Sequence, residues 1–227
     1  MRLTGTGAIL LVAGALFALG LPRLVAALVT LPASPILERI QALKAVDAKS
    51  LEILITTQQR GLKWHGTSRR WTDLGFTQIL LANEPGAAKN RNALLGEADY
   101  SLRAGLALAP SNSFAWTRLA YIDMETGGPS PSMARELRMA VMLAPYSRRL
   151  AFPRLRLIFI AWPRFGKADR RMILGQTRFA WRLDAYRLTK MATDQGRVGL
   201  VRAALFRTPK QFSRFEKLLK NYRRKRG

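Results

Sequence analysis

The chain contains no cysteine and a single histidine, His65. Without cysteine it has no disulfide framework, no thiol nucleophile and no cysteine ligands for an iron–sulfur cluster. One histidine cannot build a zinc site of His and Cys ligands, and it disfavours a Ser-His-Asp triad. The glycine patterns of phosphate-binding loops, GxxxxGK[ST] and GxGxxG, do not occur. We therefore expect no bound cofactor, no metal centre and no enzymatic activity.

Acidic residues are also scarce, with 14 Asp and Glu against 38 Lys and Arg, a formal net charge of +24. The closest acids, Glu97 with Asp99 and Asp123 with Glu125, are two residues apart and point to different sides of a helix, so neither pair suits acid/base catalysis. Residues 147–227 carry 23 basic and only 4 acidic residues. This asymmetry predicts an anionic partner, either lipid headgroups, an acidic polymer or an acidic protein. Nucleic acid is disfavoured, because the sequence has no known nucleic-acid-binding motif.

One apolar run is long enough to matter for a membrane. Residues 7–31 form a stretch of 25 residues with a single charge, Arg23. About 20 apolar residues span a bilayer, and Pro22 is tolerated where neighbouring protein satisfies the freed backbone group. We predict an N-terminal transmembrane anchor over residues 1–33. A cleaved secretory signal, with small residues near Gly20 at the cleavage site, is the alternative.

Charges on either side of this stretch suggest its orientation. Arg2 and the α-amine precede it, whereas the charges between residues 38 and 52 balance. The positive-inside rule then places the N-terminus in the cytoplasm and the remainder across the membrane. For a bacterial protein this predicts a single-pass inner-membrane protein with a periplasmic domain.

The rest of the sequence indicates successive helices, because it has no sustained period-2 alternation and no Asn-Gly hairpin. Glycine, proline and polar clusters separate the helices. The run from Phe152 to Trp162 is too short to span a bilayer and contains two arginines; it predicts a buried helix, with a membrane-surface or partner-facing helix as the alternative. We predict an all-α protein in four parts: the anchor at 1–33, linking helices at 34–67, a helical repeat domain at 68–206 and a basic amphipathic helix at 207–227.

Two segments of this body are repeated. WTDLGF at 71–76 matches WTRLAY at 116–121, and residues 102–110 match residues 137–145, both ending in Ala-Pro. The pattern resembles the tetratricopeptide repeat, which places Trp, Leu and a small residue on a first helix and ends a second helix with Pro after about 34 residues. The matching positions are Trp116, Leu119, Ala120, Leu137, Ala140 and Pro145 in the later copy, and Trp71, Leu74, Gly75, Ala98, Leu102, Gly105 and Pro110 in the earlier one.

The resemblance implies a short α-solenoid of helical hairpins in which neighbouring hairpins stack to bury their apolar faces. It implies that Trp71 and Trp116 pack between helices, with ligand stacking as the alternative, and that small residues such as Gly75 let helices approach closely. The chain departs from the family where Gln78 and Asp123 replace an aromatic residue late in the first helix. A third hairpin, at 148–161 and 167–183, fits the rhythm but lacks the tryptophan.

Two sets of cations are candidate binding residues. The last helix should begin at Thr208-Pro209 and carry an apolar stripe that includes Phe212, Phe215 and Leu219. We predict that its cations contact an anionic partner or lipid, although a capping helix with solvated charges is the alternative. These cations are Arg214, Lys217, Lys220, Arg223, Arg224, Lys225 and Arg226. Arg103 and Arg138 recur at the same repeat position, and they form either a basic ladder for an anionic ligand or solvated surface charges.

Together these features favour a non-enzymatic, membrane-anchored scaffold or assembly subunit of a bacterial envelope complex. It would bind protein partners through the domain that resembles tetratricopeptide repeats. The layout also resembles small proteins encoded with bacterial exopolysaccharide and envelope-assembly machinery. The alternative is a protein that binds an anionic polymer or a lipid surface through its basic C-terminal third.

Overall fold

Every regular element in the computed structural model, which describes residues 3–42 and 44–224, is a helix. The predicted all-α class with a long apolar N-terminal helix is confirmed. The chain divides into two compact units, Met1–Pro110 and Ser111–Gly227, and each is described by itself. The division falls inside the range predicted as one repeat domain, and the four predicted part boundaries stay predictions.

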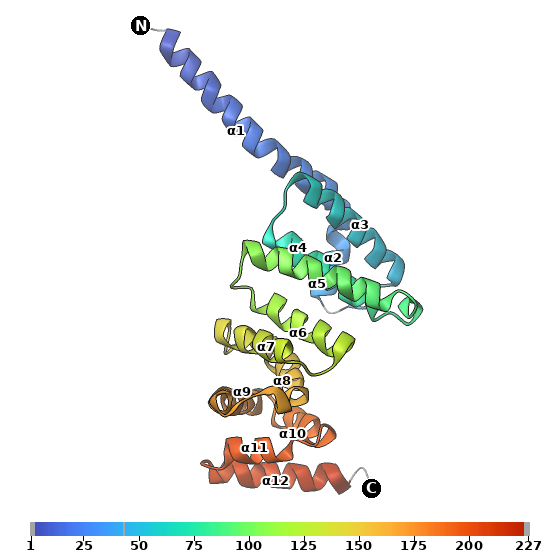
Figure 1. The fold of residues 1–227 in the computed structure, drawn as a ribbon, viewed down its shortest axis with the longest axis vertical. Helices are drawn as coiled ribbons and strands as arrows, with labels where there is room; N and C mark the ends of the chain where they lie inside the picture. The colour runs from blue at the N-terminus through green and yellow to red at the C-terminus, as the bar shows by residue number, and fades with distance from the viewer. Residues whose placement is uncertain (1–2, 43, 225–227) are drawn as a thin grey trace. The chain divides into compact units, whose positions relative to one another are not determined.

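The first unit contains α1 to α5, and the second contains α6 to α12 (Figure 1). The bounds in the first unit are α1 (Leu3–Thr30), η1 (Leu31–Ala33), α2 (Ser34–Gln41), α3 (Ala48–Trp64), α4 (Ser68–Ala82), η2 (Pro85–Ala87) and α5 (Arg91–Leu108). Those in the second are α6 (Ser113–Gly127), α7 (Pro131–Leu143), α8 (Ala151–Ile160), η3 (Trp162–Arg164), η4 (Lys167–Asp169), α9 (Arg170–Leu183), α10 (Ala185–Asp194), α11 (Val198–Leu205) and α12 (Pro209–Arg224).

Helix α1 has two parts with different surroundings. Every side chain described from Leu11 to Leu21 is exposed, although the segment is almost entirely apolar. Pro22 is the first half-buried residue of the helix, and Ala26 is fully buried where α1 meets α3. A Cβ atom on Gly61 of α3 would come within 2.5 Å of Thr30 Cγ2, so the two helices touch closely at this glycine. The free part of α1 and its contact with α3 are visible in Figure 1.

Helices α4 and α5 form the hairpin that the first sequence repeat predicts. Glycine occupies both points at which the two helices approach most closely. A Cβ atom on Gly75 would lie 2.8 Å from Leu102 Cγ, and one on Gly105 would lie 2.6 Å from Thr72 Cγ2. The expected close approach at the small repeat residues is confirmed. The hairpin turns through η2, between the end of α4 and the start of α5.

The second unit is built around one apolar core. It contains residues from α6 through α12, and α8 contributes more buried residues to it than any other helix, including the fully buried Leu155, Ile158 and Phe159. The prediction of a buried helix after Phe152 is therefore confirmed. The hairpin of α6 and α7 is tied by a hydrogen bond from the Ser113 hydroxyl to the Ala140 carbonyl, at 2.8 Å.

Arg154, in the middle of α8, is fully buried. Its guanidinium donates to the carbonyl oxygens of Ala140 at 2.7 Å and Ala144 at 3.1 Å, and to Gln176 Oε1 at 2.7 Å. Helix α7 ends at Leu143, and the last carbonyls of a helix have no partner within it. Arg154 therefore caps α7 from a neighbouring helix. Burial lowers the pKa of Arg154 to about 10, so the group stays charged at neutral pH.

Candidate functional site

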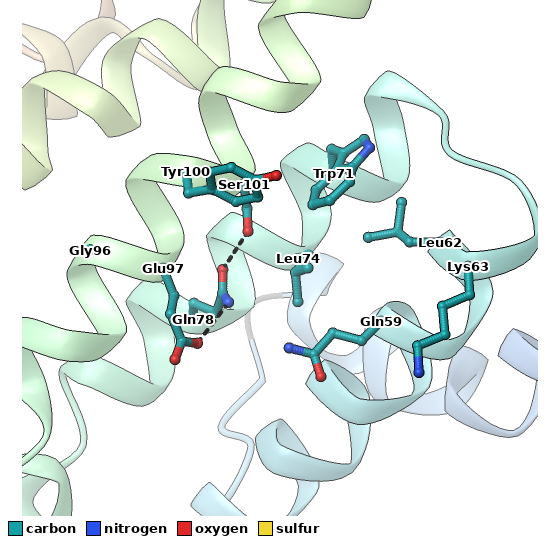
Figure 2. Close-up of a pocket in the computed structure, with 10 residues that line it drawn as sticks. All are labelled: Gln59, Leu62, Lys63, Trp71, Leu74, Gln78, Gly96, Glu97, Tyr100 and Ser101. Atoms are coloured by element: carbon teal, nitrogen blue, oxygen red, sulfur yellow. Dashed lines mark hydrogen bonds between the residues drawn. The ribbon is translucent and has the colours of Figure 1, made fainter.

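An open pocket lies in the first unit between α3, α4 and α5, with a volume of about 630 Å³. Each helix contributes to it from one face, at the spacing of helical turns. Figure 2 shows the side chains that surround the opening. The lining residues are Gln59, Leu62 and Lys63 of α3, Trp71, Leu74 and Gln78 of α4, and Gly96, Glu97, Tyr100 and Ser101 of α5.

A buried polar network holds one side of this pocket. The Gln78 amide donates from Nε2 to Glu97 Oε2 at 3.1 Å, and Gln78 Oε1 accepts from the Ser101 hydroxyl at 2.9 Å (Figure 2). Gln78 and Ser101 are both buried. Gln78 stands where the repeat family has an aromatic residue, and here its amide links α4 to α5. The departure from the repeat pattern is thus a hydrogen-bonded contact that also positions the Glu97 carboxylate.

Aromatic and apolar side chains line another side. Trp71 packs against the core of the first unit and meets Tyr100 edge to face, with ring centroids 6.0 Å apart. Trp71 is half-buried and Tyr100 is exposed, so both rings reach the pocket. The two interpretations of Trp71 are therefore compatible, because one ring packs on the core and lines an open site. In the second unit Trp116 is also half-buried, whereas Ala115, Leu119 and Ala120 on the same helix are fully buried.

The pocket has space in front of Gly96 and charge on two sides. An added Cβ on Gly96 would have no heavy atom within 4 Å among the described residues. Lys63 on α3 and Glu97 on α5 lie on opposite sides of the opening in Figure 2. A partner group that is apolar in the middle, with an anionic group near Lys63 and a cationic group near Glu97, therefore fits this surface. Sequence analysis missed the pocket, because only the packing of α3 beside the hairpin creates it.

The predicted C-terminal helix is present as α12, and it begins at Pro209 as expected. Its stripe residues Phe215, Leu219 and Tyr222 are buried against the second unit. The Tyr222 hydroxyl donates to Asp194 Oδ1 at 2.9 Å, which fixes α12 on α10. The stripe therefore packs as a capping helix would.

The predicted contact cations of α12 point outward. The side chains of Arg214, Lys217, Lys220, Arg223 and Arg224 are exposed, and Lys225 and Arg226 lie outside the described residues. Arg214 differs from the others because its guanidinium lies 5.9 Å from the centre of the Trp181 ring. The exposed cations have room for an anionic partner, and the contact itself stays a prediction.

The two arginines of the predicted ladder both have carboxylate partners. Arg103 pairs with Asp99 at 2.8 Å, one turn earlier on α5. Arg138 donates to both oxygens of Asp169, from Nε at 2.6 Å and from Nη2 at 2.9 Å. The hydrogen bond from Arg138 lowers the pKa of Asp169, and the same contact raises the pKa of Arg138. The two arginines belong to different units, so the ladder stays a prediction.

No group of three or more His, Asp and Glu side chains that could hold a metal ion occurs within residues 3–42 and 44–224. His65 follows α3 directly, and its carbonyl accepts a hydrogen bond from Arg70 at 2.9 Å. Comparison of the chain with protein-family models and with curated proteins finds no match. The site therefore has to be interpreted from its own geometry.

Proposed function

We propose that this protein is a non-enzymatic scaffold or assembly subunit of a bacterial envelope complex, held in the membrane by α1. The pocket between α3, α4 and α5 carries the proposal. It is lined by two aromatic rings and apolar side chains, it is held in shape by buried hydrogen bonds, and it is open to solvent. Such a surface is typical of sites where an anchor side chain of a partner protein docks.

Helix α1 supports the anchoring part. Its most apolar 18-residue window, within Leu11–Ile40, has a mean hydropathy of 2.0 and is 6% buried, unlike the core helix of a soluble protein. A signal sequence passes the same test of length and composition. We favour an uncleaved single-pass anchor in the inner membrane, with the N-terminus in the cytoplasm and the helical units in the periplasm.

The helical hairpins support the interaction part. The α4–α5 hairpin, with glycine at its closest approach, forms the kind of surface on which tetratricopeptide-like domains bind partner proteins. A partner in an exopolysaccharide or envelope-assembly system would place an apolar side chain between Trp71 and Leu74. Lys63 and Glu97 would then contact polar groups beside it.

The test uses a substitution that fills the pocket and leaves the packing of the helices unchanged. Gly96→Leu places a side chain on α5 in the open space of the pocket. Gly175→Leu on α9 is the matched control, because a Cβ atom at Gly175 also has no described atom within 4 Å. The full chain is purified from membranes in mild detergent, and the proteins that accompany it are identified. We expect partners that follow the unaltered protein and Gly175→Leu but not Gly96→Leu. Identical partners in all three samples would refute the role of the pocket.

A second candidate function is supported by α12. Its exposed cations suit the phosphate or carboxylate groups of an anionic polymer or lipid surface. Replacing Lys217, Lys220 and Arg223 with Gln should leave the fold intact and weaken binding to anionic liposomes or to an acidic polymer. Binding should also fall steeply with salt, whereas docking in the apolar pocket should not. Unchanged binding of the triple variant at low salt would leave α12 as a solvated capping helix.

A further inference from the structure

The free part of α1 has the length of a bilayer core. Residues from Leu3 to Leu21 form about 28 Å of helix at a rise of 1.5 Å per residue, and the hydrocarbon core is about 30 Å thick. The described side chains from Leu11 to Leu21 are exposed, Pro22 is the first half-buried residue, and Ala26 is the first fully buried one. If α1 crosses the membrane, its first cation, Arg23, therefore lies at the level of the lipid headgroups.

The fold brings other cations to the same level. Helix α3 runs back along α1, so its last residues lie toward the free part of α1 (Figure 1). Arg23, Ala26 and Thr30 share the face of α1 that meets α3, because they are spaced at i, i+3 and i+7. A second pocket, of about 390 Å³, lies on this face and is lined by Arg23 together with Arg69 and Arg70 of α4.

The pocket has the chemistry of a phosphate site. Three arginines line it against a single acidic residue, Asp73, whose Oδ2 lies 3.7 Å from Arg69 Nε. Arg70 is held in place by its hydrogen bond to the His65 carbonyl at 2.9 Å. Arginine binds phosphate oxygens through several N–H groups at once.

An aromatic residue marks the same boundary. Trp64 ends α3 and is 53% exposed, directly before His65, which lines the pocket. Tryptophan is enriched at the membrane–water interface, where its ring lies at headgroup level and its N–H reaches water. At the level of the headgroups the exposed Trp64 ring would contact lipid instead of water.

We propose that the pocket lined by Arg23, Arg69 and Arg70 binds the phosphate headgroup of an anionic phospholipid, with Trp64 inserted beside it. The site would fix the depth of α1 and seat the first unit on the membrane surface. This inference rests on the proposed crossing of the membrane by α1, and it concerns a site separate from the protein-docking pocket and from α12.

The experiment uses the full chain in vesicles of phosphatidylcholine that contain a small, equal fraction of brominated phosphatidylglycerol or brominated phosphatidylcholine. Bromine on the acyl chains quenches tryptophan at short range, and subtracting the signal of Trp64→Phe isolates Trp64. We expect stronger quenching by brominated phosphatidylglycerol. Arg23→Gln with Arg69→Gln should lower this preference by about fivefold or more, because each cation near an anionic surface contributes about that much.

Controls separate this site from other causes. Arg170→Gln with Arg171→Gln removes the same charge from exposed positions on α9 and should keep the preference. Inorganic phosphate should lower the preference more than sodium chloride of equal ionic strength, because it competes for the same arginines. Binding of inorganic phosphate by a protein that shows no lipid preference would assign the pocket to a free anion instead. Equal quenching by both lipids in the unaltered protein, or a preference that survives the Arg23/Arg69 variant, would overturn the proposal. Retention in carbonate-washed vesicles reports the crossing of α1 separately.

Discussion

Replacing Arg154 with methionine tests whether the buried guanidinium stabilises the second unit. Methionine is unbranched, uncharged and close to arginine in volume, so the change removes the hydrogen bonds and keeps much of the packing. The Ala140 carbonyl would still accept a hydrogen bond from the Ser113 hydroxyl, and the Pro145 carbonyl would still accept one from the Gln176 amide. The Ala144 carbonyl and Gln176 Oε1 would each lose the bond from Arg154.

The magnitude follows from two opposing terms. The variant loses three hydrogen bonds from a charged donor, although the Ala144 carbonyl keeps the Ser147 N–H as a donor. At about 1.5–3 kcal/mol for each bond, their loss costs about 4–9 kcal/mol. Against this, the variant no longer buries a charge: burial lowers the pKa of Arg154 to about 10, which corresponds to about 3 kcal/mol. Because the first term is larger than the second, we expect Arg154→Met to lower the free energy of unfolding by about 1–6 kcal/mol.

The assay is urea unfolding of the full chain in mild detergent, with native-state amide exchange to localise the effect. Amides at the end of α7 should lose protection before those of α4 and α5. Arg156→Met is the matched control, because Arg156 is exposed two residues further along α8, and it should change stability by less than about 0.5 kcal/mol. If Arg154→Met is as stable as the unaltered protein, the burial cost exceeds the value of the cap and the reasoning is refuted.

Two further predictions concern packing and pH. Gly75→Val should destabilise the α4–α5 hairpin by about 1–3 kcal/mol in the same urea assay, because its side chain would meet Leu102 and the Ala98 carbonyl, whereas Gly96→Ala should be neutral or stabilising; equal effects of the two changes would contradict the close contact. The folded-state pKa of Asp169 is lowered, so its ion pair contributes stability above the ordinary aspartate value of 3.8 and loses it as pH falls further. Asp169→Asn should therefore lower stability at neutral pH and weaken the acid dependence of unfolding, and an unchanged pH profile would show that the ion pair contributes nothing.

Local sequence patterns were sufficient to predict most of the helices. Thr67, Asn112 and Ser130 accept hydrogen bonds from the first turns of α4, α6 and α7, and each lies in a polar or glycine-rich cluster that the sequence marks as a helix boundary. The apolar stripe of α12 is buried as its spacing predicts. These features depend on residues within a few positions of one another, so they are visible without the fold.

Features that join distant residues were not predicted. Arg154 stands in an apolar run, and sequence analysis used it only as evidence against a membrane span. Its acceptors lie 10 and 14 residues before it and 22 residues after it. Arg138 was predicted to face a ligand or solvent, whereas it pairs with Asp169, 31 residues further along the chain. Only the packing of whole helices brings such groups together.

The boundary between the membrane anchor and the first unit falls inside the apolar run, where sequence analysis does not place it. The sequence shows one apolar run of 25 residues, and composition alone treats all of it as anchor. In the structure the run is shared: its first part is exposed, and its last turns pack on α3, where Ala26 is fully buried and Gly61 leaves room for Thr30. Apolar side chains suit lipid and protein surroundings equally well, so hydropathy cannot separate the two parts.

Arg23 marks the division, because a cation is costly in hydrocarbon and well placed at a headgroup. The last turns of α1 thus belong to the first unit as much as α3 does, and a chain shortened at residue 33 would uncover the face of α3 on which those turns pack.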